Sequence, residues 1–448
     1  MPTNALRNAI NTATSKNLVK AFQTKFQQLN PIYNPVIATA NHNTGTHEYK
    51  DAPLNGVPFL VKEVINVENF ATTLGDPSLK RSFASALFTR SKTKDEEAGL
   101  VKTLKELGGV VVGKTNIPLK GLDVQCENPM YGLTLNPNDT AKTCGGSSGG
   151  SAVAVKLGMV PFALGSDLAG SLRIPAAFCG VTSMRCSYGK LPVTGHVPPA
   201  PPASDVEAES SLQIGPICQD IGSLQTFLSL VEGNVVVEKD AGSQPASLKP
   251  SEVSVALSSQ IGGFAVDARV SAYLQEDFVP SLRQAGIKDV VDVNDISSAS
   301  FDLKQINKAY VAFSKRFFVE MNGRSSEKAL DNAVIYREEL RQIIDGIIGE
   351  NDALILPTCP AGLPFDLNPK KSRIDIRQED GKSKAVPYWP AVLTYVLPFT
   401  ISGHPVVTLP IGKIGALPLG VQVVGKRGSD EHLLHVCRVL EEVLEKKH

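Results

Sequence analysis

The chain has 448 residues and carries 45 basic and 45 acidic side chains, so its formal net charge is zero. This balance gives no electrostatic indication of a nucleic acid or an anionic membrane as partner. Hydrophobic residues make up 42% and charged residues 20% of the chain, as in ordinary globular proteins with a sizeable core.

The N-terminal part of the chain has a helical pattern. Apolar residues recur at helical spacing between residues 4 and 30 and predict one or two amphipathic helices, and Pro31 and the NHNTGTH run predict a loop. We expect residues 1–50 to be a helical segment that packs on one domain spanning residues 1–448. The chain has no apolar secretory segment at its start, and its seven cysteines form no CxxC pair. These features predict a reducing location, the cytoplasm.

A short apolar run, Val57 to Val61, predicts a buried strand that ends at Lys62. A lysine in this position is most often a solvated strand end, and as a catalytic base it would need to be desolvated.

A helix is expected from Asp95 to Leu107, followed by a core strand at Val110–Val112. Residues 108–115, GGVVVGKT, match the phosphate-loop pattern. We reject nucleotide binding there, because valines fill the loop positions and Pro118 follows where a helix should begin.

The segment from Gly145 to Gly180 contains two glycine–serine loops separated by a helix at residues 152–158. Glycines let backbone N–H groups approach a ligand closely, and serines between them suit covalent acyl transfer. A phosphate cradle or a flexible connection would have the same local pattern. Asp167 and Arg173 flank the second loop, either as a surface ion pair or as a buried pair that shapes it.

The second half of the chain alternates between strands and helices, which indicates an α/β fold. Two polar or Pro-rich segments, residues 197–210 and 240–252, are expected to be surface loops. The expected elements are a strand at Val253–Leu257, a helix at Val266–Ala285, a strand at Val290–Val291, a helix at Ala329–Ile348 and a strand at Ala353–Leu356.

Residues 364–386 are densely charged and predict a solvated loop, with a lid over the substrate channel as the alternative. Val386 to Ile411 has no charged residue and is long enough to span a bilayer, but it holds five prolines. We expect buried strands and turns there. A last amphipathic helix is expected to begin at Ser429.

The loop segment resembles the amidase-signature family, which has GGSSGGS, then a GSDxAGSLRxPA-like loop, then FCG. Further matching motifs span roughly residues 50 to 445 and are GVPFLVKE, GKTN, NP, GP, SGHP and LPLGVQ. The resemblance implies an α/β fold with a large, mostly parallel mixed sheet surrounded by helices. It also implies an amidase that hydrolyses a carboxylic acid amide to an acid and an amine or ammonia through an acyl-enzyme, without metal or cofactor. Esters should react too.

By motif position the resemblance implies a catalytic triad of Lys62 as base, Ser147 as bridging serine after a cis peptide bond, and Ser171 as nucleophile. The implied oxyanion donors are the N–H groups of Leu168, Ala169, Gly170 and Ser171. The implied supporting residues are Ser148, Asp167 and Arg173. We expect Met130, Tyr131 and Trp389 to line the substrate pocket, with Tyr388 and Phe399 nearby.

The chain departs from the family pattern at Ser166, where Thr is frequent, at Ala169, where Gly is frequent, and at residues 185–187, Arg-Cys-Ser in place of Lys-Pro-Thr. These departures put the subfamily and the substrate in doubt. The alternative within the family is the glutaminase subunit of a tRNA-dependent amidotransferase, but its S-x-D-Q-x-GP segment is missing before Gly215–Pro216. A homodimer is compatible with the sequence.

Two other nucleophile systems remain open at this level. A Ser-His-Asp hydrolase would need His196 or His404, although no G-x-S-x-G elbow is present in the right setting. A cysteine nucleophile would be Cys144 or Cys179, which flank the two loops, but their apolar settings favour a structural role.

Overall fold

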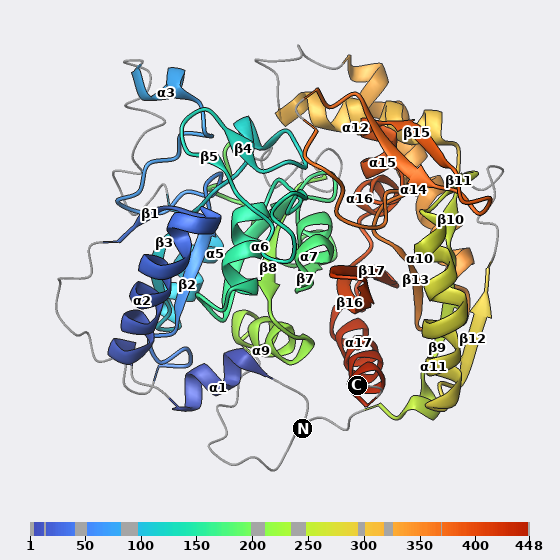
Figure 1. Cartoon of the computed structure of the whole chain (residues 1–448), viewed down its shortest axis with the longest axis horizontal. Coiled ribbons are helices and arrows are strands. Elements are labelled where there is room, and N and C mark those ends of the chain that lie inside the picture. The colour runs from blue at the N-terminus through green and yellow to red at the C-terminus, as the bar shows by residue number, and fades with distance from the viewer. Residues whose placement is uncertain are drawn as a thin grey trace.

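The computed structural model describes residues 4–12, 15–40, 52–81, 97–198, 211–233, 248–293, 301–317, 326–368 and 370–446. Figure 1 shows the arrangement of their helices and strands. The α-helices are α1 Ala5–Thr12, α2 Ser15–Tyr33, α3 Pro77–Arg81, α5 Gly99–Glu106, α6 Gly149–Lys156, α7 Arg173–Cys179, α9 Ile221–Val231, α10 Ala268–Tyr273, α11 Val279–Gln284, α12 Leu303–Phe317, α14 Glu327–Ile348, α15 Tyr388–Leu393, α16 Leu397–Ser402 and α17 Asp430–Glu445. The strands are β1 Val36–Thr39, β2 Pro58–Lys62, β3 Val110–Thr115, β4 Glu127–Asn128, β5 Gly132–Leu133, β6 Phe162–Asp167, β7 Thr182–Arg185, β8 Gln213–Cys218, β9 Ser254–Leu257, β10 Gln260–Ile261, β11 Phe264–Ala265, β12 Asp289–Asp292, β13 Ala353–Pro357, β14 Arg373–Arg377, β15 Ser383–Pro387, β16 Val406–Ile414 and β17 Leu417–Gly425.

A sheet of eleven strands organises the described part of the chain, in the order β1-β3-β2-β6-β8-β7-β16-β17-β13-β9-β12. β3, β2 and β6 are parallel neighbours, and so are β13, β9 and β12. The strands between these two groups pair in antiparallel fashion. The predicted fold class, an α/β structure with a large mixed sheet surrounded by helices, is confirmed (Figure 1). The sheet was expected to be mostly parallel, but antiparallel pairs outnumber parallel ones among its described strands.

Strand β2 places Lys62, the predicted base, on the face of the sheet that α6 covers. All five of its residues are buried. Phe59 and Val61 face the core that includes α5, α9 and α17, whereas Leu60 packs on the other side with α2 and α6. Successive strand residues point to opposite faces, so Lys62 lies on the α6 side, at the end of the strand. The predicted strand is confirmed, and Lys62 is not a solvated end.

Helices α6 and α7 lie on one face of the sheet and follow the two glycine–serine loops (Figure 1). The residues of α6 from Gly149 to Val155, and all residues of α7, are buried. Their small side chains let the helices approach the sheet and each other closely. Helices α9 and α17 contact each other and cover the opposite face. The two serine loops are thus held between buried helices and the sheet.

Gly150, in the first turn of α6, lets this helix touch backbone. A Cβ at this position would lie 2.5 Å from Asn116 N and 2.6 Å from the carbonyl oxygens of Asn116 and Pro35. We expect Gly150→Ala to lower the free energy of unfolding by about 3 kcal/mol, because backbone atoms have to move to admit the methyl group. Thermal denaturation measures this change.

Gly346, inside α14, is the matched control for Gly150. No atom lies within 4 Å of a Cβ built at Gly346. Gly346→Ala is therefore expected to stabilise the protein by about 0.5–1 kcal/mol, since alanine is the better helix former. A Gly150→Ala variant as stable as the wild type would contradict the packing argument.

The N-terminal helices pack on the rest of the chain. The N–H groups of Ala5 and Leu6 donate to Asp220 and Ser223, which lie at the start of α9, at 3.0 Å each. Helix α2 buries Phe22 in the core that it shares with α6. It continues through Pro31 to Tyr33, so the predicted loop begins later than expected. The NHNTGTH run lies outside the described residues.

The charged segment at residues 364–386 is not a loop, which corrects the prediction. It forms a hairpin in which β14 and β15 pair in antiparallel fashion. In β14, Ile374 and Ile376 are buried and the charged residues that alternate with them are exposed. This period-two pattern is that of a half-buried strand, and the high charge density concealed it.

The uncharged segment Val386–Ile411 forms two short helices, α15 and α16, before β16 begins. The prediction of strands and turns was therefore wrong for the part of the segment that these two helices occupy, up to Ser402. Pro398 stands in the first turn of α16, where a missing N–H is tolerated. Among the described residues, no helix has both the length and the apolar content needed to cross a membrane.

The remaining expected elements are present with shifted ends. Helix α5 begins at Gly99 rather than Asp95. The helix expected at Val266–Ala285 is divided into α10, a π-helical turn at Leu274–Phe278 and α11. GGVVVGKT forms strand β3 instead of a phosphate loop. Most of the two expected surface loops, residues 199–210 and 240–247, lies outside the described residues.

Candidate active site

Lys62, Ser147 and Ser171 are far apart in the chain and meet at the end of β2. Lys62 Nζ lies 2.7 Å from Ser147 Oγ, and Ser147 Oγ lies 3.0 Å from Ser171 Oγ. Lys62 is 1% and Ser147 3% exposed. The three residues thus form an unbroken hydrogen-bonded chain from an amine to a hydroxyl, which is the arrangement that activates a serine nucleophile.

The bridging serine lies in a tightly packed glycine loop. The peptide bond between Gly146 and Ser147 is cis, as the family resemblance implied. Gly145 has a φ of +81°, and a Cβ there would lie 2.6 Å from Pro175 Cα. Ser148 N–H donates to the carbonyl oxygen of Ser171 at 3.2 Å. This bond ties the two serine loops together and places Ser147 beside Ser171.

Burial sets the protonation state of Lys62. Desolvation lowers its pKa from 10.5 to about 7, while Asp167 and Cys126 act in the opposite direction. A lysine with this pKa is largely neutral just above neutral pH and has a lone pair with which to accept a proton. Lys62 therefore has the protonation state that a general base needs.

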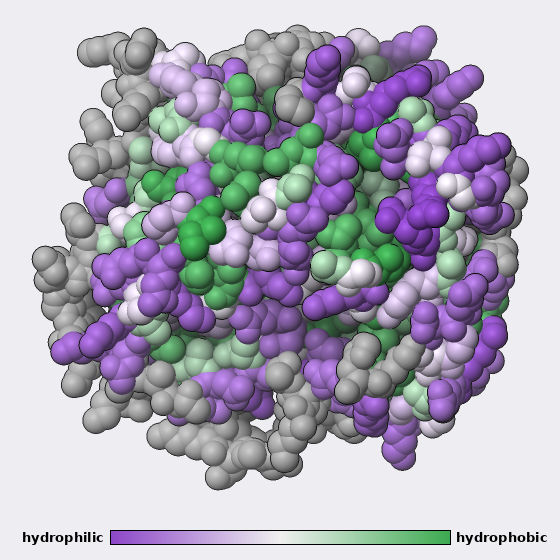
Figure 2. Space-filling view, in the orientation of Figure 1, coloured by the Kyte–Doolittle hydropathy of each residue, from purple (hydrophilic) through white to green (hydrophobic). Residues whose placement is uncertain are grey.

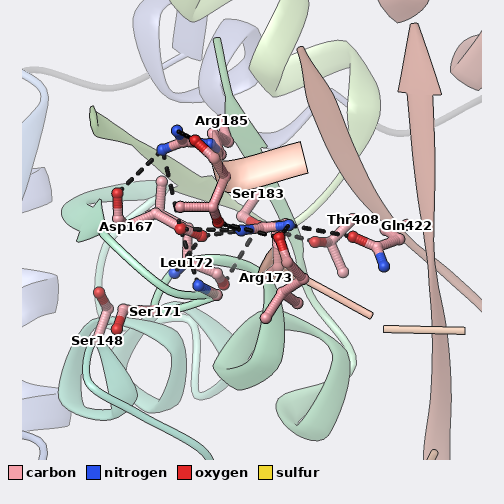
Figure 3. A network of polar contacts seen from close by, with 12 residues as sticks. Ser148, Asp167, Ser171, Leu172, Arg173, Ser183, Arg185, Thr408 and Gln422 are labelled. Atoms are coloured by element: carbon pink, nitrogen blue, oxygen red, sulfur yellow. Dashed lines mark hydrogen bonds and ion pairs between the residues drawn. The ribbon is translucent and has the colours of Figure 1, made fainter. Parts of the chain in front are cut away.

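Asp167 and Arg173 form a buried ion pair beside Ser171 (Figure 3). Arg173 Nε and Nη2 donate to the two carboxylate oxygens of Asp167 at 3.0 Å each. The guanidinium group also donates to Val396 O, Thr400 Oγ1 and Gln422 Oε1. The interpretation as a buried pair is confirmed, and the surface ion pair is excluded.

Arg185 is a second cation at Asp167, and the sequence indicated it only as a departure from the family pattern. Its Nη1 donates to the Asp167 carbonyl oxygen at 3.0 Å and lies 3.9 Å from Oδ1. Burial by itself would raise the pKa of Asp167, but Arg173 and Arg185 outweigh it and hold this pKa well below its usual range. The carboxylate accepts the N–H groups of Gly170 at 2.9 Å and Leu172 at 3.2 Å. It thereby shapes the loop that carries Ser171.

We expect Asp167→Asn to lower the free energy of unfolding by about 3–5 kcal/mol, because two buried arginines lose their counter-charge. Since the pKa of Asp167 is depressed in the folded state, this stabilisation is present above about pH 4 and is lost as pH falls through the folded pKa. Urea denaturation at pH 7 measures the change. Asp380→Asn is the control, because the pair of Asp380 with Lys382 is exposed and worth about 0–1 kcal/mol. Equal effects of both substitutions would contradict this interpretation.

The predicted oxyanion loop needs one correction. Gly170 N–H already donates to Asp167, so it is not a donor to substrate in this structure. In the described part of the chain, no protein acceptor binds the N–H groups of Leu168, Ala169 or Ser171. The positive φ of the loop lies at Gly170, at +90°, and Ala169 has an ordinary φ.

Two polar residues beside Lys62 were not predicted as site residues. Lys62 Nζ donates to Ser166 Oγ at 3.0 Å and to the Ser166 carbonyl oxygen at 3.3 Å. Ser166 Oγ lies 3.1 Å from His196 Nε2. The signal for Ser166 was its departure from the family's threonine, and His196 stood out only as an alternative base. The supporting Ser148 is buried and exchanges hydrogen bonds with the Ser166 backbone.

Tyr388 is the expected pocket residue that the structure links to the serine loop. Its hydroxyl donates to Asp123 Oδ1 at 2.7 Å, and the Asp123 carbonyl oxygen would lie 2.6 Å from a Cβ at Gly146. Trp389 is 44% exposed and packs edge-on against Tyr388. Figure 2 shows hydrophobic surface near the middle of this face, over β4, β5 and α6 and again over α15 and α16.

The other expected pocket residues have weaker links to the site. Tyr131 OH lies 3.2 Å from Thr73 Oγ1, and the backbone N–H of Met130 donates to the Asn128 side chain. Phe399 is fully buried in the main core. Among the described residues, no recorded contact connects Met130 or Trp389 with the three triad side chains.

The alternative nucleophile systems find no support. Cys144 and Cys179 are fully buried; a hydrogen bond with Cys126 and burial raise the pKa of Cys144, and burial raises that of Cys179. Both are therefore thiols, not reactive thiolates. His404 contacts Ser402 Oγ at 2.9 Å and Asp345 Oδ1 at 3.0 Å, but Ser402 is completely buried.

Known proteins resemble this chain in sequence and in fold. The family model described as Amidase matches residues 14–323 and 304–434. One subunit of the glutamyl-tRNA(Gln) amidotransferase of Methanospirillum hungatei is 29% identical over 443 residues, which cover 88% of this chain and 94% of that protein. The 6-aminohexanoate-cyclic-dimer hydrolase of Paenarthrobacter ureafaciens is 27% identical over 475 residues, which cover 95% and 91%. A solved structure of a 6-aminohexanoate cyclic dimer hydrolase with substrate has the same fold, with a TM-score of 0.76 at 24% identity, and the match covers 99% of this chain and 97% of that one.

Proposed function

The chain belongs to the Amidase family and is an amide hydrolase that acts on carbon–nitrogen bonds other than peptide bonds, and we propose that it works through a Ser171–Ser147–Lys62 triad and an acyl-enzyme. One observation carries the proposal. The hydrogen bonds of 2.7 Å and 3.0 Å join a desolvated lysine to a serine, and the backbone N–H donors beside this serine have no acceptor among the described residues. This combination provides the base, relay and oxyanion donors that acyl transfer requires.

The first half of the reaction forms an ester. Neutral Lys62 accepts the Ser147 hydroxyl proton while Ser147 accepts the proton of Ser171. The Ser171 oxygen then attacks the amide carbonyl carbon, and the carbonyl electron pair becomes an oxyanion. When this intermediate collapses, the C–N bond breaks and the proton returns through Ser147 to the leaving nitrogen. The amine or ammonia departs and leaves an acyl group on Ser171.

The second half hydrolyses the ester by the same relay. A water molecule transfers a proton through Ser147 to Lys62 and attacks the acyl carbon, and collapse breaks the bond to Ser171. The carboxylic acid departs and Ser171 recovers its proton. An ester substrate follows the same course, with an alcohol as the leaving group.

The oxyanion of both steps is assigned to the N–H groups of Leu168, Ala169 and Ser171. Their lack of protein acceptors among the described residues supports this assignment. Removal of one such donor from a serine hydrolase costs about 3–4 kcal/mol of transition-state stabilisation. Gly170 instead supports the loop through Asp167.

The proposal is tested by assaying the purified chain with small aliphatic, aryl and peptide-like amides and the matching esters. Release of ammonia or amine together with the acid is the expected result. The apolar surface near α6, α15 and α16 favours substrates with an apolar acyl group. A folded chain that hydrolyses none of the amides or esters would contradict the proposal.

A second candidate function is the glutaminase subunit of a tRNA-dependent amidotransferase. The observation that favours it is the 29% identity to the glutamyl-tRNA(Gln) amidotransferase component from Methanospirillum hungatei. The missing S-x-D-Q-x-GP segment favours the free-standing amidase. Glutamine as the preferred substrate, together with partner subunits that copurify with the chain from its own cells, would establish this alternative.

Three finer expectations stay proposals. The seven cysteines are all free and buried, which supports a reducing, cytoplasmic location that cell fractionation can test. Light scattering on the purified chain distinguishes the proposed homodimer from a monomer. We also keep the proposal that the charged segment, residues 364–386, acts as a lid, in the form of the β14–β15 hairpin. Both strands of this hairpin contact α15.

A further inference from the structure

A second hydrogen-bonded chain begins at Lys62 and leads away from Ser147. Lys62 Nζ lies 3.0 Å from Ser166 Oγ, which lies 3.1 Å from His196 Nε2. His196 Nδ1 lies 3.0 Å from the carbonyl oxygen of Pro198. Ser166 is 3% and His196 8% exposed, so water does not compete freely for these bonds. The proposed mechanism does not use this chain.

The last hydrogen bond of this series, between His196 and the Pro198 carbonyl oxygen, determines the direction of the other hydrogen bonds in it. A carbonyl oxygen only accepts, so His196 Nδ1 carries a proton, and in a neutral ring Nε2 then has the lone pair. Burial lowers the pKa of His196 to about 3; the bond to Pro198 opposes this shift and the charge of Lys62 adds to it. The ring is therefore neutral at working pH. Ser166 O–H donates to Nε2, and the oxygen lone pairs of Ser166 face Lys62.

A neutral lysine has two N–H donors and one lone pair, and three oxygens surround Lys62 Nζ. Two of them belong to Ser166, namely Oγ at 3.0 Å and the carbonyl oxygen at 3.3 Å. With its proton directed to His196, Ser166 accepts both N–H groups. The lone pair is left for the third oxygen, that of Ser147, at 2.7 Å.

We propose that Ser166 and His196 are positioning residues that direct the lone pair of neutral Lys62 at Ser147. This inference rests on the proposed function, because it concerns the base of that relay. Without His196, the Ser166 hydroxyl has no acceptor and turns to donate to the Lys62 lone pair. Ser147 then competes with Ser166 for the base.

The inference makes a directional prediction for the pH dependence. The titratable groups that face Lys62 are Asp167 at the end of β6, Cys126 just before β4, and His196. Asp167 stays ionised because Arg173 and Arg185 hold its pKa far below the working range. Removal of the Ser166 hydroxyl takes an acceptor away from Lys62 and therefore disfavours the ammonium form of this lysine. Removal of His196 lets the Ser166 hydroxyl turn and donate to Lys62, which favours the neutral amine. Either change lowers the pKa of Lys62.

The test follows the rate at which a fluorophosphonate labels Ser171, by intact mass, from pH 5 to pH 9. For Ser166→Ala and His196→Phe we expect the maximal rate to fall about 10²-fold, because the base is misdirected. We also expect the midpoint of the acidic limb to move below that of the wild type. Ser166→Thr and His196→Gln retain the hydroxyl and the acceptor respectively, and should restore the wild-type midpoint.

His404→Phe is the matched control, because His404 is also buried and bonds a serine and a carboxylate away from Lys62. It should leave the midpoint unchanged. Labelling of Ser171 in the wild type, with unchanged midpoints in Ser166→Ala and His196→Phe, would overturn this inference and leave the proposed function standing. A wild type that is not labelled at Ser171 would overturn both. Should His196→Phe fail to fold, Ser166→Ala, which removes one oxygen, decides the question.

Discussion

Ser171→Ala is expected to lose all reaction with a fluorophosphonate and to lower kcat/KM for every amide substrate by about 10⁴-fold or more. The reason is geometric: Ser171 Oγ stands at the end of the proposed relay, 3.0 Å from Ser147, and its loop provides N–H groups that have no protein acceptor in the described part of the chain. A methyl group at this position can neither attack a carbonyl nor hold an acyl group. Intact-mass analysis with peptide mapping measures the labelling, and a steady-state assay measures kcat/KM.

Ser183→Ala is a matched control for Ser171→Ala. Ser183 is a buried serine close to the same loop (Figure 3), where its hydroxyl donates to Leu172 O at 3.3 Å, but it has no bond to the relay. The control should be labelled like the wild type. An adduct that persists in Ser171→Ala would disprove the nucleophile assignment and direct attention to other serines of the loops.

Lys62→Met is expected to lower kcat/KM by about 10³-fold, the usual size of a general-base contribution. The wild-type rate should rise about tenfold per pH unit below pH 7 and level off above it. The sign follows from the role of the amine: a base acts when neutral, and the pKa of Lys62 is lowered to about 7, so protonation switches it off as pH falls. The variant should lack this acidic limb. A pH profile of kcat/KM measures both effects.

Lys114→Met separates the base from buried lysines in general. Lys114 is also fully buried and its pKa is lowered to about 8, but it faces Glu63 and bonds Ile65 O and Thr72 Oγ1, not the serines. Its variant should keep the limb near pH 7, whatever its stability. A limb that disappears in Lys114→Met and survives in Lys62→Met would refute the assignment of the base.

The local sequence pattern was sufficient to predict those elements that depend mainly on residues close to them in the chain. The run from Val57 to Val61 is apolar and bounded by turns, and it became a fully buried strand. The same holds for α14 and α17, whose starts at Ser326 and Ser429 fall within a few residues of prediction. Such elements follow from hydrophobic periodicity and turn residues, which act over a few positions.

The prediction was wrong where two features of the sequence indicated different structures. In β14 the charged outer residues masked the buried Ile374 and Ile376, so a strand was taken for a loop. In α15 and α16, prolines suggested breaks, although Pro398 in a first helical turn interrupts no hydrogen bond. Sheet pairing and burial decided both cases, and a short stretch of sequence specifies neither the pairing nor the burial.

The sequence by itself determined the family and the fold class and indicated Lys62, Ser147 and Ser171 as the candidate triad, because these depend on residue types at fixed motif positions. Only the tertiary structure decided what surrounds them. Gly170 N–H belongs to Asp167, Arg185 shares that carboxylate, and Ser166 connects Lys62 to His196, which lies 134 positions further along the chain. Protonation and hydrogen-bond direction depend on burial and on partners from distant strands, and a linear motif contains neither.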